Sequence, residues 1–534
     1  MAGSILRLVI RLSNSGLREI YVLRWQRMEG LHVMLQVIQN YRSGELKLQE
    51  VPSPILKSGG VIVRTCYSLV SVGTERSTVE MSQKSLLGKA RERPDLTRQV
   101  IATARRMGVK NTVDLVRTRL NAPVPLGYSL SGVVESVSRD VPGVQVGDLV
   151  ACAGAGYASH AERVFVPRNL MARVPTEVSA QEAAFTTLGS IALHGVRQAH
   201  AQLGDHVGVI GLGLVGQLTV GLLRAQGCRV LGIDLNEHPV QLSTQMGADL
   251  ALLRSEPDLV ERVGDAAGRI GLDTVIITAG TSSNDAFQLA AELLRDKGTL
   301  VVVGGIKMEI VKSVSSDFYR KEIDIRFSRS YGPGRYDPHY EEKGVDYPVG
   351  YVRWTENRNM RCFLELVASK RICLRPLITD IIPFARATDV YEMILAKDSA
   401  SHVGILLEYS EAPRQSPGRI TLRQASLPAS EVVGIGMIGA GKFAQSNILP
   451  YLKRHPGVVL KGVCTSQGLT ARNVAERFGF EYCSHDAREV MGDRDVASIF
   501  IATRHDSHAK YVIEALKEGK RVFVEKPLCI ERAE

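Results

Sequence analysis

The stretch Val207-Gly-Val-Ile-Gly-Leu-Gly-Leu-Val-Gly decides the fold of the middle of this 534-residue chain. Its opening apolar residues are typical of a buried strand, and Gly211, Gly213 and Gly216 follow in the spacing GxGxxG. In that spacing the first glycine allows a tight turn, the second lets a pyrophosphate approach the backbone, and the third lets the next helix pack closely on the strand. The stretch therefore predicts a strand, a turn and a helix whose N-terminus faces the phosphates of a dinucleotide.

An acidic residue downstream indicates which dinucleotide binds. The next strand-like run covers residues 229–233 and ends at Asp234, 23 residues after Gly211. A carboxylate at this place binds both hydroxyls of the adenosine ribose and repels a 2′-phosphate. We therefore expect NAD rather than NADP, with Arg229 and His238 as basic neighbours that weaken the preference. A purely structural glycine turn is the alternative interpretation.

The pattern of the chain changes at this glycine-rich stretch. Before it, valine-rich runs at residues 61–64, 132–137 and 148–152 are broken by Gly and Pro, which is typical of a β-rich domain. After it, strand-like runs at 274–278 and 299–303 alternate with helical segments, which predicts a parallel sheet. The fold class is therefore α/β, and the length predicts three or four domains.

Three further motifs precede the glycine-rich stretch. They are Pro125-Leu-Gly-Tyr-Ser-Leu-Ser-Gly-Val-Val-Glu, Val146-Gly-Asp-Leu-Val and Gly156-Tyr-Ala-Ser-His-Ala-Glu. Together with the Gly211 fingerprint they make residues 34–409 similar to the medium-chain alcohol dehydrogenase family. The resemblance implies a GroES-like β-rich domain that works with a Rossmann domain, and hydride transfer between a nicotinamide cofactor and an alcohol or carbonyl carbon.

The positions that bind zinc in that family carry other residues here. Val72 precedes Gly73-Thr74-Glu75, Tyr128-Ser129 follows the glycine of the second motif, and Thr186-Thr187 stands near the start of the coenzyme domain. None of them supplies the ligands that zinc prefers, so we expect no metal. By resemblance, Thr74 occupies the hydroxyl relay position and Tyr128 a former ligand position. We expect acid–base and oxyanion roles for these two, with Glu75 orienting either one, and buried structural groups as the alternative.

A later segment is dense in arginine and aromatic residues. Between Ser328 and Trp354 the chain reads Ser-Arg-Ser-Tyr-Gly-Pro-Gly-Arg-Tyr, then Tyr340, Tyr347 and Tyr351-Val-Arg-Trp. Such a segment can stack on a sugar ring or clamp a carboxylate or phosphate, and an oligomer interface is the alternative. With the basic helical insert, it resembles a branch of the family that is fused to a sugar oxidoreductase module in bacterial surface-polysaccharide clusters.

A second glycine-rich unit lies near the end of the chain. Ile435-Gly-Met-Ile-Gly-Ala-Gly-Lys-Phe-Ala supplies Gly439 and Gly441, with Ala444 in the third position of the fingerprint. With Ile501-Ala-Thr-Arg-His-Asp-Ser-His-Ala and Val522-Phe-Val-Glu-Lys-Pro-Leu, this unit makes residues 432–534 resemble the Gfo/Idh/MocA family. The resemblance implies that Lys526 lies beside the nicotinamide and the substrate.

Two features separate this unit from that family. Thr465-Ser466 stands where an acid usually binds the ribose, which leaves NADP possible as the cofactor of this unit. The sequence also ends eight residues after Lys526, before the β-rich substrate domain of the family. We therefore expect a truncated module without independent catalysis.

These patterns predict the following segments. They are an N-terminal extension (1–33), a GroES-like catalytic domain (34–177) with a helical insert (77–120), a Rossmann NAD-binding domain (178–328), a return segment (329–409), a linker (410–431) and a truncated Gfo/Idh/MocA-like Rossmann domain (432–534).

Composition narrows the partners and the compartment. The net charge of +10 comes from residues 1–33 and 84–119, where basic and aromatic residues do not alternate, so we expect solvated helical faces and no nucleic acid. No apolar run is long enough to span a membrane, and the scattered cysteines favour a reduced cytoplasm. We expect a homo-oligomeric NAD(P)-dependent oxidoreductase with a sugar-like substrate. A zinc-independent quinone or enone reductase and a non-catalytic dinucleotide-binding protein are the alternatives.

Overall fold

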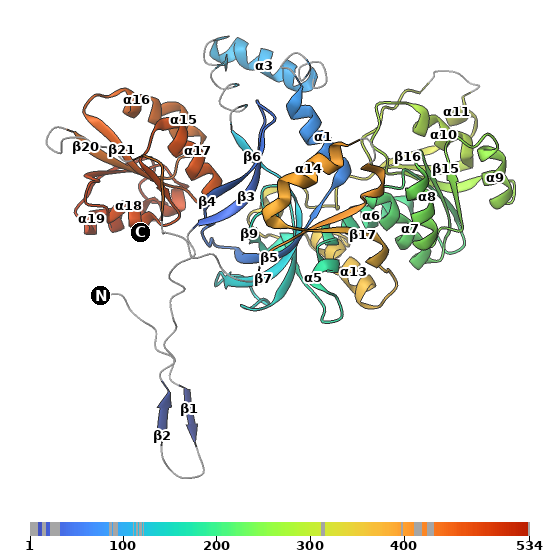
Figure 1. Cartoon of the computed structure of the whole chain (residues 1–534), viewed down its shortest axis with the longest axis horizontal. Helices are drawn as coiled ribbons and strands as arrows, with labels where there is room; N and C mark the ends of the chain where they lie inside the picture. Colours follow the sequence, from blue (N-terminus) through green and yellow to red (C-terminus); the bar gives the residue numbers. More distant parts are fainter. Residues whose placement is uncertain are drawn as a thin grey trace.

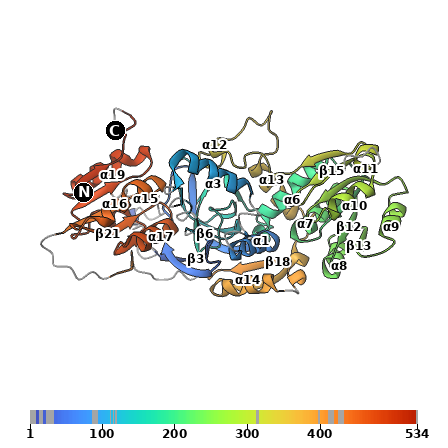
Figure 2. The same cartoon turned by 90° about the horizontal axis from the view of Figure 1, so that it is seen from above.

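The computed structural model places three folded bodies in a row, and Figure 2 shows the same row from above (Figures 1 and 2). The described residues are 9–12, 18–21, 33–84, 88, 94–109, 112–113, 116, 120, 122–310, 316–396, 399–410, 419–423 and 432–531. Near the N-terminus, β1 (Val9–Leu12) pairs antiparallel with β2 (Arg18–Tyr21). The rest of the predicted extension, 1–8, 13–17 and 22–32, lies outside the described residues.

A mostly antiparallel β body forms the middle of the row (Figure 1). Its seven-stranded sheet has the order β10-β8-β7-β5-β18-β17, with β9 pairing β5, and a three-stranded sheet has the order β4-β3-β6. The strands are β3 (Val33–Asn40), β4 (Leu46–Pro52), β5 (Gly60–Val70), β6 (Pro123–Pro125), β7 (Ser129–Val137), β8 (Leu149–Ala153), β9 (Arg163–Pro167), β10 (Met171–Arg173), β17 (Ile378–Pro383) and β18 (Gly404–Glu408). Because β18 pairs with β5, the chain returns after the Rossmann body to complete this sheet.

A parallel six-stranded sheet follows, with the order β13-β12-β11-β14-β15-β16. Its strands are β11 (His206–Ile210), β12 (Arg229–Asp234), β13 (Leu250–Leu253), β14 (Leu272–Ile277), β15 (Leu294–Val302) and β16 (Asp324–Phe327). Its helices are α7 (Leu214–Gln226), α8 (Glu237–Gln245), α9 (Leu259–Ala266), α10 (Asp285–Leu293) and α11 (Asp317–Arg320). The order reverses at β11, which is where ligands bind in open sheets of this kind.

A second six-stranded sheet has the order β19-β22-β21-β20-β23-β24. Its strands are β19 (Arg419–Thr421), β20 (Val433–Ile438), β21 (Val458–Cys464), β22 (Tyr482–Ser484), β23 (Ser498–Ile501) and β24 (Arg521–Val524). Its helices are α15 (Lys442–Asn447), α16 (Leu449–Arg454), α17 (Gly468–Phe478), α18 (Ala487–Met491) and α19 (His508–Lys517).

The predicted linker covers residues 410–431, but residues 419–421 within it form a strand of the second sheet. Strand β19 pairs antiparallel with β22, and Ile420 is buried in the core of the second sheet. Sequence reasoning missed this strand because a three-residue strand has no readable period and its pairing partner lies far along the chain. Residues 411–418 and 424–431 lie outside the described residues.

The remaining helices surround the β body. They are α1 (Val72–Gln83), α3 (Pro94–Met107), α5 (Ala180–Ala183), α6 (Thr186–Ala199), α12 (Pro338–Glu341), α13 (Glu356–Ala368) and α14 (Ala387–Leu395), with 3₁₀ turns at Arg168–Leu170, Arg375–Leu377, Phe384–Arg386 and Ser399–Ser401. A further 3₁₀ turn, His505–Ser507, precedes α19 in the second Rossmann body. Helix α1 begins at Val72, before the predicted start of the insert at residue 77. No helix in the described part of the chain is both long and apolar enough to cross a membrane.

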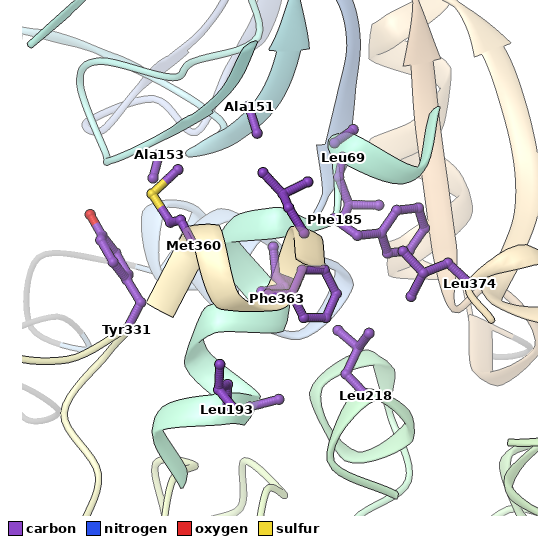
Figure 3. Packing of buried hydrophobic residues seen from close by; sticks show 14 of the residues in the cluster. Leu69, Ala151, Ala153, Phe185, Leu193, Leu218, Tyr331, Met360, Phe363 and Leu374 are labelled. Carbon is purple, nitrogen blue, oxygen red and sulfur yellow. The ribbon is translucent and has the colours of Figure 1, made fainter. Parts of the chain in front are cut away.

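One hydrophobic core joins the β body to the first Rossmann body. Phe363 of α13 packs against Gly189 of α6, where an added Cβ would lie 2.3 Å from the phenyl ring. Leu218 of α7 belongs to the same core, and Figure 3 shows Phe185, Met360 and Phe363 within it. Because α6 contributes to this core and packs on α7, it sets the position of the fingerprint helix relative to the β body.

Candidate functional site

The first glycine-rich turn has the geometry that a dinucleotide needs. Gly211 has φ of +94°, and an added Cβ there would lie 2.6 Å from the backbone nitrogen of Ala279. At Gly216 an added Cβ would lie 2.0 Å from the Gly211 carbonyl oxygen, so only glycine allows this approach of helix to strand. An added Cβ at Gly213 meets nothing within 4 Å. The backbone is therefore open where the pyrophosphate approaches.

The Asp234 carboxylate stands at the end of β12 beside this turn. Its Oδ2 accepts a hydrogen bond from the Leu212 backbone N–H at 2.7 Å, and its Oδ1 accepts one from the Asn236 backbone N–H at 2.9 Å. Oδ1 also accepts a longer hydrogen bond from Asn236 Nδ2 at 3.3 Å, so Oδ2 is the oxygen whose second lone pair remains for a ribose hydroxyl. Asp234 thus both holds the glycine turn and offers the charged acceptor that the sequence predicts.

Two of the predicted catalytic residues meet at the start of α1. The Tyr128 hydroxyl donates to Ser71 Oγ at 2.7 Å and lies 3.4 Å from Thr74 Oγ1. Burial raises the pKa of the Tyr128 hydroxyl, and the hydrogen bonds to Ser71 and Thr74 offset only part of this rise. Tyr128 therefore stays protonated at neutral pH and acts as a hydrogen-bond donor.

Ser71 was missed by sequence reasoning. It precedes Val72 and the Gly-Thr motif, where a serine is most often an ordinary helix N-cap. Its side chain makes no capping hydrogen bond to α1, and it accepts the Tyr128 hydroxyl instead. The adjacent Thr74 is exposed, so the three hydroxyls form a short chain from a buried group to the surface.

Glu75 lies behind this cluster and not in it. It is 3% exposed, and it accepts hydrogen bonds from the Ser71 backbone N–H at 3.0 Å and the Tyr391 hydroxyl at 2.7 Å. His160 Nε2 lies 3.2 Å from its Oε2, and the other ring nitrogen of His160 lies 2.7 Å from Ser68 Oγ. The contacts of Glu75 therefore orient the backbone at Ser71.

Residues at the zinc-binding positions of the family that the sequence resembles lie around Tyr128 and the start of α1. Thr187 Oγ1 lies 3.3 Å from the carbonyl oxygens of both Tyr128 and Cys152, and donates toward them. Val72 stands at the start of α1 beside Ser71. Within the described residues, no group of three or more His, Cys, Asp or Glu side chains could hold a metal ion.

Trp354 of the aromatic segment is packed between two arginines, one from α6 and one from the segment itself. Trp354 has the Arg197 guanidinium 3.4 Å and the Arg353 guanidinium 3.9 Å from its ring centroid. Tyr340 is fully buried and stacks on Tyr347 at 5.3 Å. The faces of these rings are therefore occupied by side chains of the same unit.

The same segment instead contributes buried polar atoms without a partner. Within the described residues, no hydrogen bond reaches Ser328 Oγ, Tyr331 Oη, Arg335 Nε or either carboxylate oxygen of Glu356. Burial and the charge of Glu341 raise the pKa of Glu356 to about 9, and Arg335 lowers it in part. Buried polar groups normally have a hydrogen-bond partner, so these atoms are exceptional.

Sequence reasoning did not single out Glu356. An acid in the first turn of a helix is ordinary because it complements the helix dipole. Its complete burial, 0% exposed, is what distinguishes it, and no local pattern reports burial of that kind. His194 lies near the same segment, and burial lowers its pKa to about 4, so it is neutral at pH 7.

The second glycine-rich turn repeats the geometry of the first. Gly439 has φ of +81°, an added Cβ at Gly441 meets nothing within 4 Å, and Ala444 is buried against the sheet. Lys526 is exposed just after β24 ends at Val524. Thr465 follows β21 and donates to the Gln467 carbonyl oxygen at 2.7 Å.

Two families match this chain, one for each glycine-rich unit. Residues 215–342 match the family described as zinc-binding dehydrogenase. Residues 433–534 match the family described as oxidoreductase family, NAD-binding Rossmann fold. Both resemblances predicted from the motifs are thereby confirmed.

Curated relatives that match about half of this chain are named as a dehydrogenase and a reductase. The D-guloside 3-dehydrogenase of Escherichia coli (strain K12) is 28% identical over 271 residues, which are 50% of this chain and 72% of that protein. The D-xylulose reductase A of Aspergillus oryzae is 24% identical over 304 residues, which are 51% of this chain and 78% of that protein.

Solved structures share the fold of the first two bodies. Galactitol-1-phosphate dehydrogenase from Escherichia coli has a TM-score of 0.53 at 18% identity, and the match covers 70% of this chain and 100% of that one. The 2R,3R-butanediol dehydrogenase from Bacillus subtilis has a TM-score of 0.52 at 17% identity, covering 70% and 99%. The predicted fold class, a GroES-like domain with a Rossmann domain and then a second Rossmann domain, is confirmed.

Proposed function

We propose a function from the premise that residues 215–342 belong to the zinc-binding dehydrogenase family and residues 433–534 to the oxidoreductase family with an NAD-binding Rossmann fold. The chain is an NAD(P)-dependent oxidoreductase that acts on CH–OH groups. Its proposed reaction is hydride transfer between the nicotinamide and a secondary alcohol carbon of a sugar or nucleotide-sugar. Relatives named for D-guloside and D-xylulose support this substrate class.

The hydroxyl cluster carries the proposal. A bound nicotinamide dinucleotide supplies the hydride acceptor or donor at the C-terminal edge of the first parallel sheet. In the reductive direction Tyr128 donates a hydrogen bond and then a proton to the carbonyl oxygen, and Thr74, which is exposed to solvent, relays a proton back to Tyr128 while Ser71 positions the phenol. In the oxidative direction the proton passes from the alcohol to Tyr128 and then through Thr74 to solvent.

Zinc has no place in this proposal. Val72, Tyr128 and Thr187 stand at the ligand positions of the family, and an aliphatic side chain, a phenol and a threonine hydroxyl do not form a zinc shell. We propose that the Tyr128 hydroxyl polarises the carbonyl in place of a Lewis acid.

The unpartnered polar group is the proposed site for the sugar hydroxyls. Glu356 is protonated at pH 7, so it can both donate to and accept from a hydroxyl, as can Tyr331 and Ser328. A ligand that pairs with these atoms removes the cost of leaving them buried without a partner. Surface-polysaccharide metabolism is the proposed source of the substrate, on the resemblance of residues 328–354.

The cellular setting is a proposal of the same kind. All eight cysteines are free thiols, which supports a reducing cytoplasm. We also propose that the protein forms a homo-oligomer and has no nucleic-acid or membrane partner. The six segments predicted from the sequence are proposed as its domains, except that residues 419–421 belong to the second sheet.

The test is turnover of a panel of polyols, glycosides and nucleotide-sugars with NAD and NADP, using Ser71→Ala as the diagnostic variant. We expect oxidation of secondary alcohols that falls at least tenfold in kcat in Ser71→Ala, because the Tyr128 hydroxyl loses its partner. Ser77→Ala is the matched control, since Ser77 is exposed on α1 and its hydroxyl donates to the Gly73 carbonyl oxygen at 2.9 Å.

Two outcomes would contradict the proposal. Cofactor binding without hydride exchange across the panel would favour a non-catalytic dinucleotide-binding protein. Reduction of enones or quinones with NADPH that is insensitive to Ser71→Ala would favour the zinc-independent reductase.

A further inference from the structure

A cavity of about 530 Å³ lies where the β body meets the second Rossmann body. Side chains of the β body, which together with the first Rossmann body is called the first unit, form one wall, and Pro54 and Phe165 are among them. Gly441 of the second fingerprint and Ser466, just beyond β21, belong to the opposite wall. Small-molecule sites occupy about 300–1,000 Å³. The cavity is therefore of a size that suits a small ligand held between the two units.

The charged residues of the lining share one sign. Among the described residues that line the cavity they are Lys57, Arg163 and Lys442, and none is a carboxylate. Arg163 is already compensated, because its Nε lies 2.8 Å from Oε2 of Glu135. Lys57 and Lys442 thus face the cavity with a surplus of positive charge, which favours an anionic ligand.

Lys57 is the cation that the first unit brings to the cavity. It is half-buried, and its Nζ lies 5.1 Å from the centroid of the Phe165 ring. Burial and the nearby Arg504 lower its pKa, and Glu342 opposes them in part. Glu342 is itself engaged by Arg504 at 2.9 Å. The charge of Lys57 is therefore only partly compensated by neighbouring groups.

The wall from the second unit suits a phosphorylated adenosine. Gly441 leaves its side of the turn open, since an added Cβ meets nothing within 4 Å. Strand β21 ends at Cys464, and Thr465 and Ser466 follow. The acid that would repel a 2′-phosphate is thus replaced by hydroxyl side chains.

Close packing holds the two walls together. An added Cβ at Gly468 would lie 1.6 Å from the Pro52 carbonyl oxygen, so the two backbones touch. Val33 belongs to a core cluster of the second unit, and Ile55 packs against another. In return Leu469 packs against the core of the first unit. The contact is apolar and reciprocal, so the cavity has defined walls.

We propose that this cavity is a composite site for a 2′-phosphorylated adenine dinucleotide, in which Lys57 of the first unit and Lys442 of the second neutralise its phosphates. The first unit thus completes the second cofactor site with residues outside the Rossmann fold. The inference shares one assumption with the proposed function, namely that the second Rossmann body binds a nucleotide.

The test is calorimetric titration of the full chain with 2′,5′-ADP, which carries the 2′-phosphate but no nicotinamide, and with 5′-AMP for comparison. We expect 2′,5′-ADP to bind more tightly than 5′-AMP. Lys57→Met and Lys442→Met should each weaken 2′,5′-ADP at least fivefold and affect 5′-AMP less, because they remove one charge. Lys47→Met is the matched control, since Lys47 is exposed on β4 and outside the lining.

Binding of 2′,5′-ADP within twofold of wild type in both Lys57→Met and Lys442→Met would overturn the proposal. Loss in Lys442→Met alone would also overturn it, because the first unit would then take no part. Circular dichroism confirms that each variant is folded. None of these measurements involves turnover, so a chain that binds 2′,5′-ADP as expected but transfers no hydride would refute the proposed function alone.

Discussion

Removal of the Tyr128 hydroxyl tests the proposed chemistry most directly. Tyr128→Phe keeps the ring, which packs against the core of the first unit, and deletes the donor that lies 2.7 Å from Ser71 Oγ. Loss of one preorganised donor to a developing oxyanion costs about 10²–10³ in kcat. Loss of one neutral hydrogen bond costs the fold only about 1 kcal/mol. We therefore expect a large loss of turnover in a protein that remains folded.

Steady-state kinetics, NAD titration and thermal unfolding of the same preparations separate these effects. NAD affinity should stay within twofold, because the first fingerprint and Asp234 do not contact Tyr128. Tyr67→Phe is the matched control. Tyr67 packs against the same core and donates to Glu408 at 2.7 Å, outside the hydroxyl cluster. The reasoning fails if Tyr128→Phe keeps more than half of the wild-type kcat, or if Tyr67→Phe loses as much.

Four further predictions concern the metal, the cofactor, the buried acid and the second unit. Elemental analysis should find less than a tenth of an equivalent of zinc, and one firmly bound zinc per chain would contradict the ligand argument. Asp234→Ala should weaken NAD by roughly 1.5–3 kcal/mol and reduce discrimination against NADP, because a charged acceptor and a repulsive neighbour are both lost; calorimetry that shows both affinities unchanged would move the ribose site elsewhere. Because the pKa of Glu356 is raised to about 9 in the fold, the unfolded chain loses its proton first, and stability falls as pH rises from about 4.5 to 9. Glu356→Gln should remove this slope and stabilise the chain by roughly 1–3 kcal/mol at pH 7. If the melting temperatures of the wild type and Glu356→Gln change with pH in parallel, the prediction is wrong. Lys526→Ala in the full chain should leave hydride transfer within twofold, and its abolition would place the chemistry in the second unit.

The fingerprints and the ribose acid could be predicted because their geometry is local. Gly211, Gly213, Gly216 and Asp234 lie within one strand–turn–helix–strand unit, where a missing Cβ and a strand end determine what can approach the backbone. The resemblance to a dehydrogenase placed Thr74 and Tyr128 in one site, and their hydroxyl oxygens lie 3.4 Å apart.

Other features depend on segments that are remote in sequence. The hydrogen bond from Tyr391 to Glu75 joins residues 316 positions apart, and it holds Glu75 where its carboxylate accepts the Ser71 backbone N–H. Strand β19 forms by pairing with β22, and its Ile420 is buried in the core of the second sheet. No local period reports such partners, so sequence reasoning took residues 419–421 for a linker and missed Ser71.

By itself, the sequence determined that two dinucleotide folds are present and where each glycine turn must lie, because steric exclusion at a glycine acts over a few neighbouring residues. Only the tertiary structure decided that the buried Glu356 carboxylate accepts no hydrogen bond from the described residues and that Lys57 lines a cavity with Lys442. Burial and electrostatic surplus are sums over every neighbour in space, and these neighbours come from distant segments that meet only when the chain is folded.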